Sequence, residues 1–131
     1  MPFVTAARNF LANQGEFTTT EERYRGQMIE TVRYLLDNAV GIDNAISTNR
    51  IIEHLRHEGF RTYREGWQIN VLGALRDRGI FIASKRGKGM YIIETTSDCR
   101  AAIRSIEDRI EVENARLNTL RRLCREANFI T

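Results

Sequence analysis

A seven-residue apolar repeat near the C-terminus constrains the fold more than any other feature of this 131-residue chain. Apolar side chains recur there at alternating steps of four and three residues, and Glu113 is the only interruption of the register. A repeat sustained over more than three heptads predicts a coiled coil, because an ordinary surface helix does not keep its apolar residues on so strict a seam. The predicted seam consists of Cys99, Ile103, Ile106, Ile110, Leu117, Leu120 and Cys124.

The predicted C-terminal helix, residues 96–128, is long for a protein of this size. At a rise of 1.5 Å per residue it is about 40 Å long, which exceeds the expected width of the domain that precedes it. A single copy could hardly cover such an apolar stripe. We therefore expect a homodimer held together by this helix as a coiled coil. The alternative is that the helix packs back on its own domain.

Three shorter amphipathic helices are expected upstream, and each is followed by a glycine. The first starts at a capping box that Thr19 forms with Glu22. The second has Ser47 as its N-cap. The third runs from about residue 63 to residue 78 and carries Trp67 on its core face.

A β-hairpin follows the third helix. Two runs of β-prone residues, 80–83 and 90–93, flank the turn SKRGKG, which carries three cations and no acid. This turn holds both lysines of a chain that otherwise uses only arginine. Together the elements predict a mainly α protein with a small β-hairpin, an α+β arrangement. Its expected parts are an N-terminal arm or short helix over 1–18, a domain over 19–95 and the dimerisation helix over 96–128.

The order of elements between Ile46 and Ile93 resembles the winged helix-turn-helix domain. The stretch ISTNRIIEHL is similar to the positioning helix of that family, and YREGWQINVLGALRDRGIFI is similar to its recognition helix running into the first wing strand. The stretch SKRGKGMYII is similar to the wing turn and its returning strand. The ending ETTSDCRAAIRSIEDRIEV is similar to small phage and prokaryotic winged-helix proteins in which a long helix follows the wing.

This resemblance implies a protein that binds double-stranded DNA with sequence specificity, commonly as a dimer, in transcription regulation or another DNA transaction. In that family the third helix enters the major groove and the wing contacts the backbone or the minor groove. Winged helices also serve as protein–protein interaction modules, so the fold alone does not settle the function. Assembly with protein partners, without nucleic acid, is therefore the alternative function.

Two groups of side chains are the candidate DNA contacts. Cations in the wing turn neutralise phosphates and release counterions, although charged turns are also normal in solvated hairpins. Arginine bonds the major-groove edge of guanine, and glutamine or asparagine does the same to adenine, although an ordinary polar helix face has the same composition. Gln68 can also be placed on the inner face of its helix. The candidates are Lys85, Arg86 and Lys88 in the wing turn, and Thr48, Asn49, Arg61, Tyr63, Arg64 and Gln68 at the start of the second helix and the front of the third.

Charge and composition bear on the expected partners, localisation and chemistry of the protein. Residues 47–94 carry nine basic and five acidic side chains, a local excess that suits phosphate binding or, alternatively, an ordinary solvated face. No apolar run approaches the ~20 residues that span a bilayer, so we expect a cytoplasmic protein without membrane contact. The two cysteines and two histidines match no zinc spacing, and no catalytic constellation is present. We therefore expect no metal, no cofactor and no enzyme activity.

Overall fold

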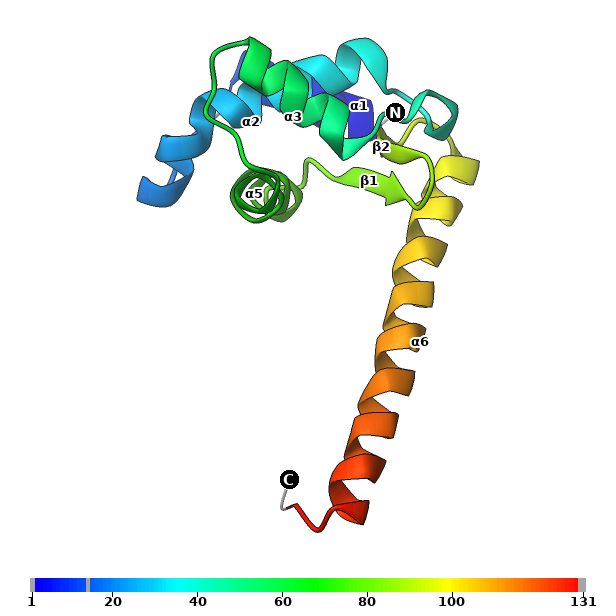
Figure 1. Ribbon diagram of the computed structural model, residues 1–131. Helices are drawn as coiled ribbons and strands as arrows, with labels where there is room; N and C mark the ends of the chain where they lie inside the picture. The colour runs from blue at the N-terminus through cyan, green and yellow to red at the C-terminus, as the bar shows by residue number, and fades with distance from the viewer. Residues whose placement is uncertain (1, 14, 130–131) are drawn as a thin grey trace.

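The computed structural model describes residues 2–13 and 15–129, and it shows a helical body from which one long helix projects (Figure 1). The protein is mainly helical with one two-stranded antiparallel sheet, as predicted. The elements, in chain order, are α1 (Pro2–Ala12), α2 (Thr19–Asn38), the 3₁₀ turn η1 (Ile42–Asn44), α3 (Thr48–His57), α4 (Arg64–Trp67), the π-helical η2 (Gln68–Leu72), α5 (Gly73–Asp77), β1 (Ile82–Lys85), β2 (Gly89–Ile92) and α6 (Thr96–Glu126).

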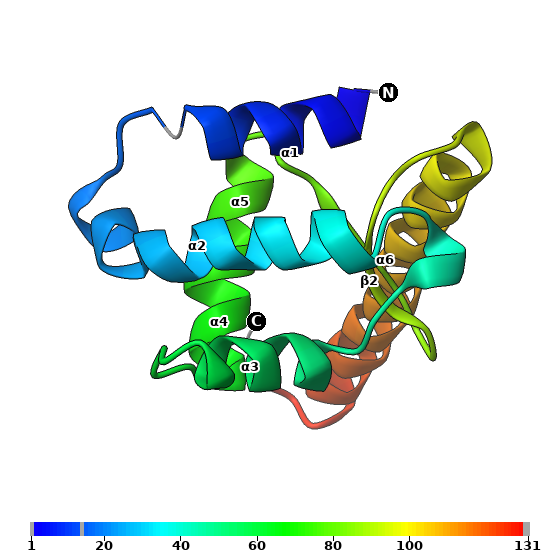
Figure 2. The ribbon, with the colours of Figure 1, turned by 90° about the horizontal axis from the view of Figure 1, so that it is seen from above.

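The body has two layers of helices. Helices α1, α2 and α3 lie alongside one another, and the continuous helical run of residues 64–77 crosses beneath them (Figure 2). The predicted core position of Trp67 is confirmed, since this side chain is buried between the layers and its Nε1 donates to Thr31 Oγ1 at 3.2 Å. The same buried cluster as Trp67 includes Met28, Leu35, Ile51, Leu55 and Leu75, and Tyr91 is fully buried in a second, smaller cluster.

Two possibilities were predicted for the N-terminal segment, an arm or a short helix, and the structure shows the short helix. Helix α1 packs on α2 through the buried side chains of Val4, Ala7 and Phe10. It therefore belongs to the body and is not a free arm. Met1 and Gln14, which the predicted segment also contains, lie outside the described residues.

The capping box of α2 lies one residue earlier than predicted. Thr18, and not Thr19, is the N-cap, and its Oγ1 accepts from the backbone N–H of Glu21 at 3.2 Å. In return the N–H of Thr18 donates to Glu21 Oε1 at 3.0 Å. The run TTTEE offers the same spacing twice, and with the earlier choice the carboxylate of Glu21 also accepts from Arg78 Nε at 2.7 Å.

The hairpin is confirmed, with β1 starting two residues later than predicted. Ile80 is part of the turn that ends the helix, because its N–H donates to Leu75 O at 3.0 Å. Strand β2 also pairs with the segment between α2 and α3. Ile46 and Met90 exchange backbone hydrogen bonds of 3.0 and 2.7 Å, and Gly41 N–H donates to Ile92 O at 2.8 Å. The hairpin is therefore fastened to the start of α3.

Helix α6 is anchored to the body only through its first turns. The buried Asp98 accepts backbone hydrogen bonds from Ile42, Glu94 and Thr95. Burial acts to raise the pKa of Asp98, but these hydrogen bonds outweigh it, so the pKa is lowered and the carboxylate stays ionised. Ala102 is the last buried residue of the helix.

The rest of α6 stands away from the body (Figure 1). Described residues from Ile103 onward are exposed, apart from the half-buried Ser105 and Cys124. Ile103 and Leu120 of the predicted seam are 52% and 59% exposed. The helix therefore does not pack back on its own domain, which was the alternative that the sequence left open. Among the described helices, none is both long enough and apolar enough to cross a bilayer.

Candidate nucleic-acid interface

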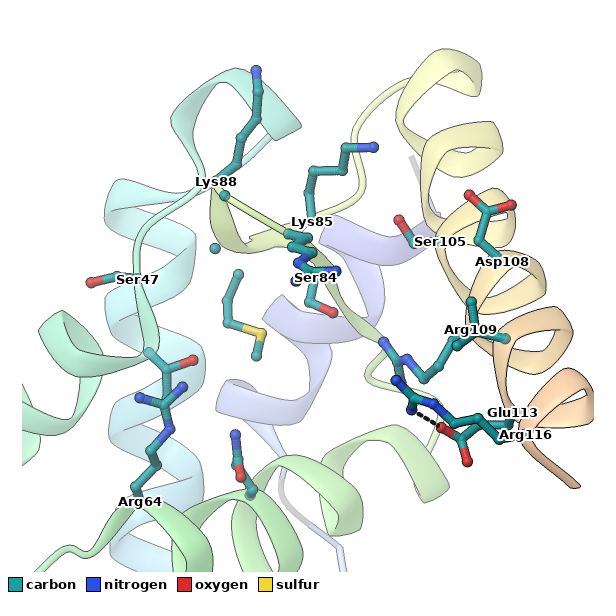
Figure 3. Close-up of a pocket in the computed structure, with 17 residues that line it drawn as sticks. Ser47, Arg64, Ser84, Lys85, Lys88, Ser105, Asp108, Arg109, Glu113 and Arg116 are labelled. Carbon is teal, nitrogen blue, oxygen red and sulfur yellow. Dashed lines mark hydrogen bonds and ion pairs between the residues drawn. The ribbon is translucent and has the colours of Figure 1, made fainter. Parts of the chain in front are cut away.

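An open cleft of about 910 Å³ lies beneath the hairpin, between the helical body and α6 (Figure 3). One wall comes from the start of α3 and the front of residues 64–77, the hairpin turn forms the roof, and α6 forms the opposite wall. We refer to it as the basic cleft, because six cations and only two acids line it. These charged residues are Arg64, Lys85, Arg86, Lys88, Arg109 and Arg116, with Asp108 and Glu113.

All three cations predicted in the hairpin turn line the basic cleft. Strand pairing ends at Lys85 and Gly89, and the N–H of Lys88 donates to Lys85 O at 2.9 Å, which closes the turn. Gly87 at its tip has a φ of +83°, a conformation that glycine adopts without strain. Lys88 Nζ lies 3.8 Å from Asp43 Oδ1, but both side chains are exposed, so this pair is weak.

The residues predicted on the helices are brought together only in part. Arg64 and Gln68 line the basic cleft, and Arg64 Nη1 donates to Asn49 Oδ1 at 3.1 Å, which joins the third helix to the start of α3. Thr48 also lines the cleft, but only 9% of it is exposed. Arg61 and Tyr63 are exposed and do not line it.

The π-helical segment explains why Gln68 faces the cleft. The N–H of Gly73 donates to Gln68 O, five residues back, so the turn is one residue wider than in an α-helix. In a regular helix, positions 68 and 72 share a face, and burial of Leu72 would bring Gln68 inward. The wide turn instead lets Trp67, Val71 and Leu72 be buried while Gln68 stays exposed.

The sequence did not predict the wall that α6 contributes. Arg109 and Arg116 point toward the cleft, and Arg116 Nη1 donates to Glu113 Oε1 at 2.7 Å (Figure 3). Arg109 also acts on Arg76 of the body, because burial and, after it, the nearby charge of Arg109 lower the pKa of Arg76. The Nε of Arg76 donates to Ile82 O at 2.9 Å. Arg109 and Arg116 are seven residues apart and flank the predicted seam. This seven-residue spacing was the one sequence signal from which a basic edge on α6 could have been predicted.

Two further features were not predicted. Ile69 is 66% exposed on the third helix beside Gln68, although it is a large apolar residue. Among the described residues, Glu30, His54 and Glu58 form a group whose potential metal-binding atoms lie within 4.8 Å of one another. Protein contacts account for the first two, since His54 Nε2 lies 2.9 Å from Glu30 Oε1 and Arg33 Nη1 donates to Glu30 Oε2 at 2.7 Å.

The chemistry of the basic cleft suits a polyanion. Cations on three sides attract phosphates, and the polar Gln68 and Ser47 offer hydrogen bonds beside them. Comparison of the chain with family models, with curated proteins and with solved structures found no match.

Proposed function

We propose that this protein is a sequence-specific double-stranded DNA-binding protein of the winged helix-turn-helix type, acting as a dimer in transcription regulation or another DNA transaction. The observation that carries the proposal is that the hairpin cations and the polar front of the third helix line the same cleft. A duplex that approaches this cleft meets Arg64 and Lys85 together. Neither enzyme activity nor a cofactor is part of the proposal.

The arrangement of backbone elements supports the winged-helix assignment. Helix α3 and the run of residues 64–77 follow one another across a short link, and the two-stranded hairpin comes next. The pairing of β2 with Ile46 gives the hairpin a third backbone segment at the start of α3. In a winged helix the corresponding hairpin is the wing, and residues 64–77 take the part of the recognition helix.

Each group of side chains then has a role. Arg64 and Gln68 have the donors and acceptors to read guanine and adenine edges in the major groove. The bond from Arg64 to Asn49 holds its guanidinium at the front of the helix. The wing cations, with Arg109 and Arg116, contact phosphates, which fixes the position of the duplex without reading its sequence.

The first test replaces the three wing cations together, as Lys85→Gln, Arg86→Gln and Lys88→Gln. A duplex is first selected from a random pool with the unmodified protein, and its affinity is then measured against salt concentration. Since each lost phosphate contact removes about 0.9 from the slope of log K against log salt, we expect a slope less steep by about 3 per bound copy. The same loss predicts an affinity roughly 500-fold lower per bound copy near 0.1 M salt.

A charge-matched control keeps this experiment specific. Arg8→Gln, Arg23→Gln and Arg33→Gln remove the same net charge from α1 and α2, two helices that contribute no residue to the lining of the basic cleft (Figure 1). The control variant should keep nearly the original slope and affinity. Equal losses in the two variants would show that net charge, and not the wing, drives binding, and the proposal would fail.

Assembly with protein partners is the second candidate, and the exposed apolar stripe of α6 favours it. Ile103, Ile110 and Leu120 are all more than half exposed, which is costly unless something covers them. This candidate predicts that no duplex is retained even at low salt, while a complex with a protein survives loss of the wing cations. The same binding assay therefore separates the two functions.

A further inference from the structure

The apolar seam of α6 matches itself when the helix is reversed. Its eight positions, residues 99, 103, 106, 110, 113, 117, 120 and 124, are symmetric about the midpoint between residues 111 and 112. Two copies can therefore pair antiparallel over the whole seam without a slip in register. The facing pairs are then Cys99 with Cys124, Ile103 with Leu120, Ile106 with Leu117, and Ile110 with Glu113, each occurring twice.

Glu113 distinguishes the two possible directions. In a parallel pair it faces the Glu113 of the second copy, so two carboxylates meet inside an apolar seam. In an antiparallel pair it faces Ile110 and lies beside Arg109 of the second copy. Its own Arg116 already donates to it at 2.7 Å, so two arginines lie near the carboxylate along one edge of the pair. Antiparallel pairing thus avoids two facing carboxylates, at the cost of bringing Arg109 of one copy beside Arg116 of the other.

The apolar residues favour the same direction. The first half of the seam uses isoleucine and the second half uses leucine, so antiparallel pairing sets each Ile against a Leu. Parallel pairing would place isoleucine at both kinds of seam position in the first half, a pattern that favours trimers over dimers.

We propose that two copies associate through α6 in the antiparallel direction, in full overlap, with Cys99 of each copy opposite Cys124 of the other. This inference rests on the dimer in the proposed function and adds its direction and register. The occupant of the exposed stripe is a second copy because the reversed stripe sets each of its isoleucines against an apolar residue or Glu113, and keeps the two Glu113 carboxylates from facing each other.

The antiparallel direction has a consequence for the basic cleft. The two-fold axis of such a pair is perpendicular to the plane of the two helices, so the same edge of both helices faces one side. Arg109 and Arg116 lie on that edge and line the cleft, so both clefts open on one face of the dimer. The four arginines form a basic strip between them. On the other edge Arg100 approaches Arg121 of the second copy, a solvent-exposed repulsion of little cost.

Distances between identical positions test the direction. The variant Cys124→Ser carries a spin label only at Cys99, and Cys99→Ser carries one only at Cys124. Because about 25 residues separate the two positions on one helix, antiparallel pairing predicts a label separation of about 38 Å in both variants. Parallel pairing predicts helix backbones about 10 Å apart at both positions. A short distance in either variant, or a monomeric mass of 15.2 kDa without dipolar coupling, would overturn the proposal.

Oxidation of the unlabelled proteins gives a second readout. With a mild thiol oxidant the unmodified protein should form a covalent dimer, because Cys99 faces Cys124. Each single serine variant should lose this product, since the remaining cysteine faces a serine. A covalent dimer that persists in both single variants would require like cysteines to face each other, and would rule out the antiparallel register.

Failure here can be told apart from failure of DNA binding. The binding assay with the selected duplex is run on the same single-cysteine proteins, which keep every side chain that lines the basic cleft. Short label distances with intact, wing-dependent binding would overturn the direction alone. Long distances without any duplex binding would overturn the proposed function and leave the antiparallel dimer standing.

Discussion

A single carboxylate, that of Glu21, joins the start of α2 to the end of the third helix. Its Oε1 accepts from the N–H of Thr18 at 3.0 Å, and its Oε2 accepts from Arg78 Nε at 2.7 Å. The two side chains of this ion pair are only 17% and 21% exposed. The hydrogen bond from Arg78, followed by that from Thr18, lowers the pKa of Glu21 from its ordinary 4.5 to about 2.

This pKa predicts how stability depends on pH. Because the folded pKa lies below the ordinary value, the contribution of Glu21 is present above pH 4.5 and is lost as the pH falls toward about 2. Glu21→Gln should cost about 1–3 kcal/mol at neutral pH and flatten the acid limb of the unfolding free energy. Denaturant unfolding between pH 2 and pH 7 measures both effects.

Glu22→Gln is the matched control, since Glu22 is exposed and pairs with Arg25 at 3.4 Å. It should shift stability by no more than about 0.5 kcal/mol. An acid limb of unchanged slope in Glu21→Gln would contradict the account of this contact.

Gly89 is the residue that allows the hairpin to touch the start of α3. Its φ is +117°, and a Cβ at this position would overlap the backbone of Ile46 and lie 2.9 Å from Ser47 N. Gly89→Ala should lower the free energy of unfolding by roughly 3 kcal/mol or more, because backbone atoms on both sides cannot yield.

Gly87→Ala is the control, because Gly87 also has a positive φ but nothing lies within 4 Å of the added methyl. It should cost about 1–2 kcal/mol. Equal unfolding midpoints of the two variants would contradict the close contact between Gly89 and the backbone of Ile46.

At the scale of elements, local signals allowed the helices and the hairpin to be predicted. N-caps and glycines act within one turn, so the start of α3 at Ser47 and its end before Gly59 could be identified from sequence. The heptad register likewise identified α6 and its exposed stripe. The choice between Thr18 and Thr19 could not be made locally, because TTTEE offers the same spacing twice and the contact of Glu21 with Arg78 spans 57 residues of sequence.

Tertiary contacts decide the rest of the site. The π-helical turn that exposes Gln68 follows from burying Trp67, Val71 and Leu72 together, which no local spacing predicts. The α6 wall of the basic cleft depends on the angle at which Asp98 and Tyr91 hold the helix against the body. The seven-residue spacing of Arg109 and Arg116 was visible in the sequence, but their position opposite Arg64 was not.

Helix α6 allows a prediction about the seam itself. Glu113→Leu fills the interrupted position and should stabilise the dimer by roughly 1–2 kcal/mol per side chain, seen as a lower dissociation constant in sedimentation. Glu111→Leu makes the same chemical change two residues away, outside the seam, and should leave dissociation nearly unchanged. Equal changes of the dissociation constant in the two variants would contradict the placement of residue 113 in the dimer seam.

At the scale of the whole molecule, one rigid helix takes part in both proposed interactions. In the proposed dimer the exposed seam of α6 faces a second copy, while Arg109 and Arg116 on its neighbouring edge line the basic cleft. Hydrogen bonds to Asp98 fix the base of this helix to the body, so the cleft has a fixed wall. We infer that dimerisation and duplex binding are coupled, because they share this one element.

The most direct test of the central claim is a nuclear magnetic resonance titration of the protein with the selected duplex. If wing and third helix contact one duplex together, shift changes should cluster in residues 47–49, 64–69, 84–89 and 105–116, which surround the basic cleft. The exposed surface of α1 should not respond. Changes limited to one wall of the cleft, or centred on α1 and α2, would contradict the claim that these elements form a single DNA-binding surface.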